Sequence, residues 1–257
     1  TPMPVRDAQL RAHDFTEVNT GYSSAHAVFE AERCLRCQDP VCVEGCPVNI
    51  PIPEFIHAVA SGDMPGAAKI LRSANPLPSI CGRVCPQESQ CESQCHMVKR
   101  FNPVAVGHLE RYVADWERTQ PIRANVKVTR KEKIAVIGAG PSGLVCAGEL
   151  ARLGYPVTIY EALHAAGGVL RYGIPEFRLP KEILDWEIDV LKAMGVEIQC
   201  NVVIGRTFTL DDLRRRFDAV FISVGAGLPV FLGIPGEGLK GVYSANEYLT
   251  REYRQGW

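Results

Sequence analysis

Eight of the ten cysteines in this 257-residue chain fall between positions 34 and 95, where they form two groups. The groups read Cys34-x2-Cys37-x4-Cys42-x3-Cys46-Pro47 and Cys81-x3-Cys85-Pro86-x4-Cys91-x3-Cys95. Such short spacers let the backbone wrap so that several thiolates reach one centre. The chain shows no signal-peptide core, so disulfides are not expected, and clustered thiols then predict a metal site.

Iron–sulfur clusters and structural zinc both take four thiolates, so either could occupy such a site. Zinc ribbons usually present two C-x2-C knuckles, whereas this chain has one such pair, Cys34 and Cys37, followed by wider gaps. The two Cys-Pro steps are typical of the last thiol of a ferredoxin run, although the other spacings depart from those of bacterial ferredoxins. The pattern favours two [4Fe–4S] clusters, with zinc and unligated thiols as the alternatives.

A glycine fingerprint opens the second half of the chain. It reads Gly138-Ala139-Gly140-Pro141-Ser142-Gly143 and lies between an apolar run and an amphipathic segment. In this context the first glycine makes a tight turn, the second lets the backbone approach a pyrophosphate, and the third permits close strand–helix packing. The N–H groups at the start of the following helix are expected to face the phosphates. These residues predict a dinucleotide site.

Residues on the C-terminal side of the fingerprint indicate which nucleotide binds. Glu161 ends the next expected strand, where an acid accepts the adenosine ribose hydroxyls. An acid there disfavours the 2′-phosphate of NADP, which leaves FAD and NAD. Gly167, Gly168 and Val169 come after Glu161 at a spacing typical of flavoproteins with two dinucleotide domains, so FAD is favoured.

The sequence predicts helices in the first part of the chain and alternating strands and helices in the second, and these elements must position the candidate residues. In the first part we expect helices at Ser24–Arg33, Ile52–Ala60, Met64–Arg72 and Val104–Arg118. Later, apolar runs alternate with amphipathic segments. Here we expect strands at Ile134–Ile137, Val157–Tyr160, Val196–Ile198, Val202–Ile204 and Ala219–Val224, and helices at Ser142–Leu153 and Lys181–Met194. This alternation predicts a mainly parallel sheet covered by helices.

The predicted fold is therefore an α+β chain of two domains. We expect an all-α double [4Fe–4S] domain over residues 1–120, a linker over 121–132, and an α/β Rossmann-like FAD domain over 133–257. After Val224 there is no second glycine fingerprint and no returning Gly-Asp flavin segment. We therefore expect the FAD domain to be incomplete, the nicotinamide domain to be absent, and the chain to be a fragment.

Composition excludes several classes of protein. The chain has 28 basic and 29 acidic residues and a net charge of −1, which argues against a nucleic-acid surface. Its hydrophobic content of 46% argues against global disorder. No apolar run approaches the roughly 18 residues needed to span a bilayer. We expect a cytoplasmic protein without membrane spans or nucleic-acid partners.

The chain resembles the small subunit of glutamate synthase over nearly its whole length. The iron–sulfur module of that family is shared with dihydropyrimidine dehydrogenase and with the large subunit of bifurcating NADH-dependent ferredoxin:NADP oxidoreductases. The matching segments are Arg33-Cys-Leu-Arg-Cys, Pro40-Val-Cys-Val-Glu-Gly-Cys-Pro, Asn49-Ile-Pro-Ile-Pro, Asn75-Pro-Leu-Pro, Cys81-Gly-Arg-Val-Cys-Pro and the flavin segment from Gly167 to Lys181.

The resemblance implies a ligand set that interleaves the two cysteine groups. One cluster would be held by Cys34, Cys37, Cys42 and Cys95. The other would be held by Cys46, Cys85, Cys91 and Glu110, where relatives place a glutamine or glutamate. Cys81 would then be spare. Cysteine arithmetic alone points to Cys81 instead, because eight thiols fill two four-thiolate sites, so both choices for the eighth ligand stay open.

The resemblance also implies flavin contacts and a function. Arg178 would contact the flavin cofactor, Ile204 would approach the adenine, and Gly225 would lie where the chain passes the cofactor. The implied function is an electron-transfer oxidoreductase subunit that passes electrons between NAD(P)H, FAD and two [4Fe–4S] clusters to a larger partner subunit or a ferredoxin-like partner. No acid–base catalytic residue is expected.

Three family members fit this description almost equally well. The glutamate synthase small subunit is favoured, and the bifurcating oxidoreductase and the electron-input module of dihydropyrimidine dehydrogenase are the alternatives. A hypothesis from another class is a zinc-stabilised scaffold with a degenerate nucleotide fold. That scaffold would be colourless and would lack iron and acid-labile sulfide.

Overall fold

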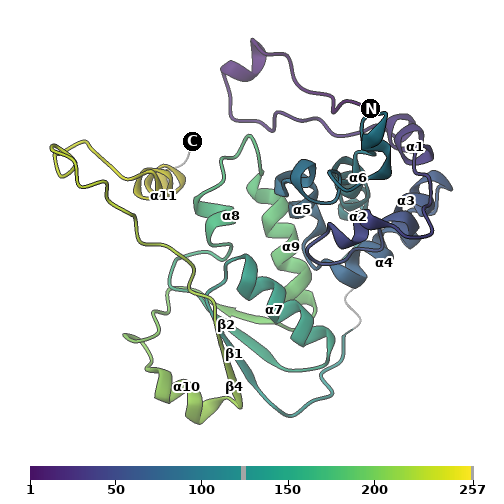
Figure 1. The fold of residues 1–257 in the computed structure, drawn as a ribbon. Coiled ribbons are helices and arrows are strands. Elements are labelled where there is room, and N and C mark those ends of the chain that lie inside the picture. The colour runs from purple at the N-terminus through teal and green to yellow at the C-terminus, as the bar shows by residue number, and fades with distance from the viewer. Residues whose placement is uncertain (123–125, 256–257) are drawn as a thin grey trace. The chain divides into compact units, whose positions relative to one another are not determined.

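The structure is a computed structural model that describes residues 1–122 and 126–255 and divides into two compact units (Figure 1). The first unit comprises residues 1–122 together with 177–183. The second comprises the other described residues. Part of the expected linker over 121–132 and the last two residues of the expected FAD domain lie outside the described residues.

The first unit is helical, as expected. It contains α1 (Ser24–Glu32), α2 (Val41–Glu44), α3 (Ile52–Ala60), α4 (Met64–Ala74), α5 (Pro78–Val84) and α6 (Val106–Arg118), with short 3-10 turns η1 (Leu10–Ala12), η2 (Gln87–Ser89) and η3 (His96–Lys99). Ser23 caps α1 through the His26 N–H, and Asp63 caps α4 through the Gly66 N–H. Phe55, Leu71 and Leu109 are fully buried where α3, α4 and α6 meet.

The second unit is built on a parallel four-stranded sheet with the order β3-β2-β1-β4. Its strands are β1 (Ile134–Ile137), β2 (Val157–Tyr160), β3 (Glu197–Gln199) and β4 (Ala219–Ile222), so β1 lies between β2 and β4 (Figure 1). The register pairs Ile137 with Tyr160 on one side and with Ile222 on the other. The carboxyl ends of these three strands therefore meet at one edge of the sheet.

Within the described residues, five helices alternate with or follow these strands along the chain. They are α7 (Pro141–Arg152), α8 (Val169–Tyr172), α9 (Lys181–Ala193), α10 (Leu210–Arg216) and α11 (Ala245–Gln255). Helix α7 packs on β1 and β2, and α10 packs on β4. The observed order of strands and helices confirms the expected α/β class, with helix and strand ends shifted by one or two residues. The described residues contain no helix long and apolar enough to cross a membrane.

One expected strand is wrong. Residues 202–204 make no ladder, and Ile204 forms only an isolated bridge with Phe208. The chain reverses at Gly205, whose φ of +95° is a left-handed conformation, and the Gly205 N–H donates to the Phe208 carbonyl at 2.7 Å. The apolar run is used as a local turn that packs on the sheet rather than as an extra strand.

Candidate iron–sulfur and dinucleotide sites

The first group of thiols surrounds one small apolar pocket in the first unit. Cys34, Cys37, Cys42 and Cys95 line it together with apolar side chains that include Ile52 and Ile56. Burial, together with the charges of Cys95, Cys34 and Cys37, raises the pKa of Cys42 to about 11. These four thiols are therefore close enough to repel one another as thiolates, a repulsion that a cationic metal centre would remove.

Arg33 ties together the two distant segments that supply these thiols. Its guanidinium donates to the Asn102 carbonyl at 2.6 Å and to the Pro103 carbonyl at 3.2 Å. The same side chain pairs with Glu30 on α1. This anchor fixes the segment after Cys95 against the end of α1, directly beside Cys34.

The second group lies around the buried thiols of Cys46 and Cys91. Burial, together with the charges of Glu92, Cys46 and Glu110, raises the pKa of Cys91 to about 12. The charges of Cys46 and Glu110 act on Cys91 because these side chains approach it. Glu110 comes from α6 and is only 5% exposed. A buried carboxylate thus lies beside two buried thiols, and the Asn75 amide donates a hydrogen bond to it.

Cys81 and Cys85 complete this second group. A hydrogen bond with Cys85 raises the pKa of Cys81 well above its usual value, and burial and the Glu110 charge act in the same direction. The same hydrogen bond lowers the pKa of Cys85 to about 7. Both choices for the eighth ligand, Cys81 and Glu110, are thus present at the same place.

The described part of the chain contains no group of three His, Cys, Asp or Glu side chains placed to hold a single metal ion. All ten cysteines are free thiols. Four of them, Cys34, Cys37, Cys42 and Cys95, line the pocket of the first group. A pocket lined by four thiols fits the four-thiolate ligation of an iron–sulfur cluster and also that of a zinc ion.

The glycine fingerprint forms a narrow cradle in the second unit. Gly138 has φ of +101°, and a Cβ on it would clash with the Ser223 carbonyl. A Cβ on Gly143 would clash with the Gly138 carbonyl. A Cβ on Gly168 would lie 2.8 Å from the Gly140 Cα, and the Gly167 N–H donates to the Ala139 carbonyl at 2.8 Å. Two loops therefore pack backbone on backbone at the start of α7, as a pyrophosphate site requires.

Glu161 lies beside this cradle at the end of β2. Its two carboxylate oxygens accept the Ala139 N–H at 2.8 Å and the Leu163 N–H at 2.9 Å. Each oxygen retains a second lone pair, so the side chain is held in place and can still accept a ribose hydroxyl. The donor set therefore fits an adenosine dinucleotide.

The structure brings most of the remaining dinucleotide candidates to this edge of the sheet. Pro141 and Ser142 begin α7, Val169 begins α8, and Gly225 follows β4 with φ of +68°. Ile204 is half-buried and packs beside Ala135 and Tyr160. Arg178 is exposed and belongs to the first unit, so its expected flavin contact stays a prediction.

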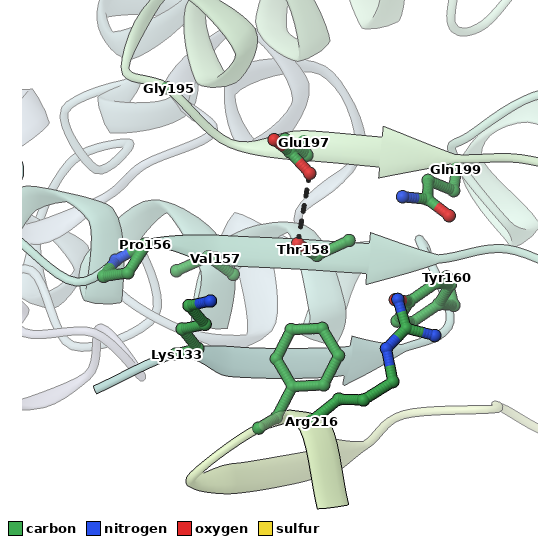
Figure 2. Close-up of a pocket in the computed structure, with 10 residues that line it drawn as sticks. Lys133, Pro156, Val157, Thr158, Tyr160, Gly195, Glu197, Gln199 and Arg216 are labelled. Atoms are coloured by element: carbon green, nitrogen blue, oxygen red, sulfur yellow. Dashed lines mark hydrogen bonds between the residues drawn. The ribbon is translucent and has the colours of Figure 1, made fainter. Parts of the chain in front are cut away.

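A separate cavity of about 500 Å³ lies along β2 and β3 (Figure 2). Thr158, Tyr160, Glu197 and Gln199 line it from alternate positions of the two strands, with Arg216 across from them. The Thr158 hydroxyl donates to Glu197 at 3.4 Å. None of the predicted site residues lines this cavity.

Two families of proteins match the chain. The family described as dihydropyrimidine dehydrogenase domain II, 4Fe-4S cluster, matches residues 11–122. The family described as pyridine nucleotide-disulphide oxidoreductase matches residues 102–228 and 132–254, which together exceed half of the chain. The first match contains both thiol groups, and the second contains the glycine cradle.

Relatives match the chain across both units. The glutamate synthase [NADPH] small chain of Escherichia coli is 37% identical over 98% of this chain and 54% of its own length. The NAD-dependent dihydropyrimidine dehydrogenase subunit PreT of the same organism is 40% identical over 84% of this chain and 53% of its own length. The chain thus spans about half the length of these relatives.

Among solved structures, FprA of Mycobacterium tuberculosis in complex with NADPH covers 48% of this chain at 29% identity and a TM-score of 0.44. That match covers 29% of FprA. From the two family matches and the relatives that span both units, we conclude that the chain belongs to the family of flavin and iron–sulfur oxidoreductases that includes the glutamate synthase small chain and PreT.

Proposed function

We propose that this chain is the electron-transfer part of a glutamate synthase-like oxidoreductase, in which electrons pass between NAD(P)H, FAD and two [4Fe–4S] clusters. The observation that carries the proposal is the pairing of two separate thiol groups with a glycine cradle in one chain. When bound, FAD would accept two electrons as a hydride and release them one at a time. Iron–sulfur clusters carry electrons singly. The protein's own residues hold, space and bury these groups.

The proposed ligands of one cluster are Cys34, Cys37, Cys42 and Cys95. The pocket that these four thiols line supports the assignment. The proposed ligands of the other cluster are Cys46, Cys85, Cys91 and Glu110. The effects of the Cys46 and Glu110 charges on Cys91, and the lowered pKa of Cys85, support this second set.

The proposed FAD site uses the glycine cradle from Gly138 to Gly143 for the pyrophosphate and Glu161 for the ribose. Gly168 and Val169 would line the same cleft, and Gly225 would let the chain pass close to the cofactor. Ile204 would approach the adenine, and Arg178 would contact the flavin. Burial of Glu161 and its two backbone hydrogen bonds keep the carboxylate aligned with the cradle.

Domains, partner and location are also proposals. We propose an iron–sulfur domain over 1–120, a linker over 121–132 and an FAD domain over 133–257, with NAD(P)H bound outside the last range. Both curated relatives are named as a small chain or a subunit. A larger partner subunit that receives the electrons is therefore proposed, with glutamate synthase as the favoured enzyme. Ten free thiols support a reducing compartment such as the cytoplasm.

The test is an anaerobic titration of the intact protein, loaded with FAD, by NADPH and then by NADH. We expect one of the two nucleotides to bleach the flavin absorption and then part of the broad iron–sulfur absorption, before any partner is added. Addition of the candidate larger subunit with glutamine and 2-oxoglutarate should restore the colour. A protein that binds FAD but shows no bleaching with either nucleotide would contradict the proposal.

A further inference from the structure

Asn75 contacts both Cys81 and Glu110 at the second thiol group without being one of the predicted ligands. It directly follows α4, is 3% exposed, and its backbone N–H donates to the Leu71 carbonyl at 2.9 Å. The side-chain carbonyl Oδ1 accepts the Leu77 N–H at 3.0 Å. Because a backbone N–H can only donate, this bond fixes which end of the amide is which.

The other end of the amide points at Glu110. Asn75 Nδ2 donates to Glu110 Oε1 at 2.7 Å, and both side chains are buried. A hydrogen bond to a buried carboxylate is charge-assisted and stronger than one between neutral groups. It fixes one carboxylate oxygen of Glu110 and with it the direction of the other.

The Asn75 amide also contacts Cys81, the other candidate for the eighth ligand. The Cys81 thiol donates toward Asn75 Oδ1 at a sulfur–oxygen distance of 3.7 Å. Leu77, whose N–H binds the Asn75 carbonyl, directly precedes α5, and α5 contains Cys81. One amide group thus contacts both candidate eighth ligands with its opposite ends, as a donor to the carboxylate and as an acceptor from the sulfur.

We infer that Asn75 is the positioning residue that selects Glu110 over Cys81 as the eighth ligand of the two clusters. The inference rests on the ligand sets proposed above. The NH2 group suits an anionic oxygen ligand and holds it in place. The carbonyl oxygen, already bonded to the Leu77 N–H, holds the Cys81 sulfur only through a longer contact of 3.7 Å. Hydrogen bonds next to the ligands are known to tune the potential of such clusters.

The test uses Asn75→Asp in the intact, anaerobically purified protein. The aspartate keeps an acceptor for the Leu77 N–H but replaces the donor to Glu110 with a like charge. Asn246→Asp is the matched control, because the Asn246 amide also donates, to the Gly227 carbonyl at 2.6 Å, in the other unit. The readouts are electron paramagnetic resonance of the reduced clusters, a potentiometric titration, and iron content.

We expect Asn75→Asp to change or abolish the signal of the second cluster while the first cluster keeps its signal and potential. Cys81→Ala alone should leave both signals unchanged. If Asn75→Asp retains a second cluster with an altered signal, adding Cys81→Ala should remove it, because the sulfur has then replaced the carboxylate.

Two results would overturn the inference. Both clusters could keep wild-type signals and potentials in Asn75→Asp. Alternatively, Asn75→Asp and the milder Asn75→Ser could both lose the two clusters together, which would show a purely structural role. A wild-type protein without any cluster would instead refute the proposed function, so the two failures are distinguishable.

Discussion

Gly82 of α5 lies directly against the backbone of Arg111 in α6. A Cβ on Gly82 would come within 2.5 Å of the Arg111 nitrogen and 2.7 Å of its Cα. The neighbouring residues in the two helices are Cys81 and Glu110, which lie at the second thiol group. The missing side chain at position 82 therefore sets how closely α5 and α6 approach, and with it the spacing of the residues around the proposed second cluster.

Gly82→Ala should push the two helices apart. Overpacking of this kind costs about 1–3 kcal/mol, and here we expect it to displace Glu110 from the other ligands. The measurement is thermal unfolding together with the resonance signal of each cluster, and the second signal should weaken more than the first. Gly227→Ala is the control, because its Cβ would meet no atom within 4 Å. Equal loss in both variants would contradict the packing argument.

Glu110→Ala and Cys81→Ala distinguish the two candidate eighth ligands. We expect Glu110→Ala to reduce the iron content by about half and to abolish the second cluster signal, because its carboxylate is the proposed ligand. Cys81→Ala should retain both clusters, since its thiol is expected to be spare. The checks are iron and sulfide analysis and resonance spectra. The reverse pattern would assign the site to Cys81 instead.

Glu161→Gln should weaken flavin binding by at least about tenfold, because a buried hydrogen bond to a charged group contributes roughly 1.5–3 kcal/mol. The glutamine amide can accept only one of the two N–H groups now bound by the carboxylate. Flavin released on filtration and the FAD dissociation constant are the measurements. Glu149→Gln on the exposed side of α7 serves as control and should bind FAD normally. Unchanged affinity in Glu161→Gln would rule out the proposed ribose contact.

Thr209→Ala should loosen α10 alone. Thr209 and Asp212 form a reciprocal cap, and loss of a threonine cap costs about 1 kcal/mol. Hydrogen bonds from the Thr209 hydroxyl and N–H, with help from Arg215, lower the pKa of Asp212 to about 2. Because the pKa of Asp212 is lower in the folded chain than in the unfolded chain, its ionised carboxylate stabilises the fold at any pH above the unfolded pKa. That stabilisation is lost as the pH falls toward 2.

In Thr209→Ala the pKa of Asp212 should rise toward its ordinary value, as a carboxyl-detected NMR titration would show. Thr119→Ala, which removes a hydroxyl bonded to the Trp116 carbonyl, should leave Asp212 unchanged. Cluster and flavin content should stay at wild-type levels in both variants. An unshifted Asp212 in Thr209→Ala would mean that the cap contributes nothing in solution.

Much of the fold could be predicted because its apolar periodicity is strong. The helix over Ile52–Ala60 and the strands over Ile134–Ile137 and Val157–Tyr160 match the structure residue for residue. Five α-helices of the described residues were not predicted, namely α2, α5, α8, α10 and α11, and two of them show a physical reason. Helix α5 is only seven residues long between cysteines, and α10 is charge-rich with a single buried residue, Leu213, so its capping box was the only local sign of a helix.

The candidate sites were less predictable where they depend on contacts distant in sequence. The contact between Asn75 and Glu110 joins residues 35 positions apart, and the close approach of Gly82 to Arg111 depends on how two helices pack. The motif around Asn75 was visible in the sequence, but nothing local to it shows which side chain the amide faces. The expected strand over 202–204 failed because the turn at Gly205 outweighs the strand propensity of its apolar residues.

The central claim is that the two thiol groups hold iron–sulfur clusters. Its most direct test is elemental analysis of anaerobically purified protein for iron, acid-labile sulfide and zinc. Two [4Fe–4S] clusters require about eight irons and about eight sulfides per chain, with no stoichiometric zinc. A colourless protein with about two zinc ions and no labile sulfide would contradict the claim and favour a zinc-stabilised scaffold.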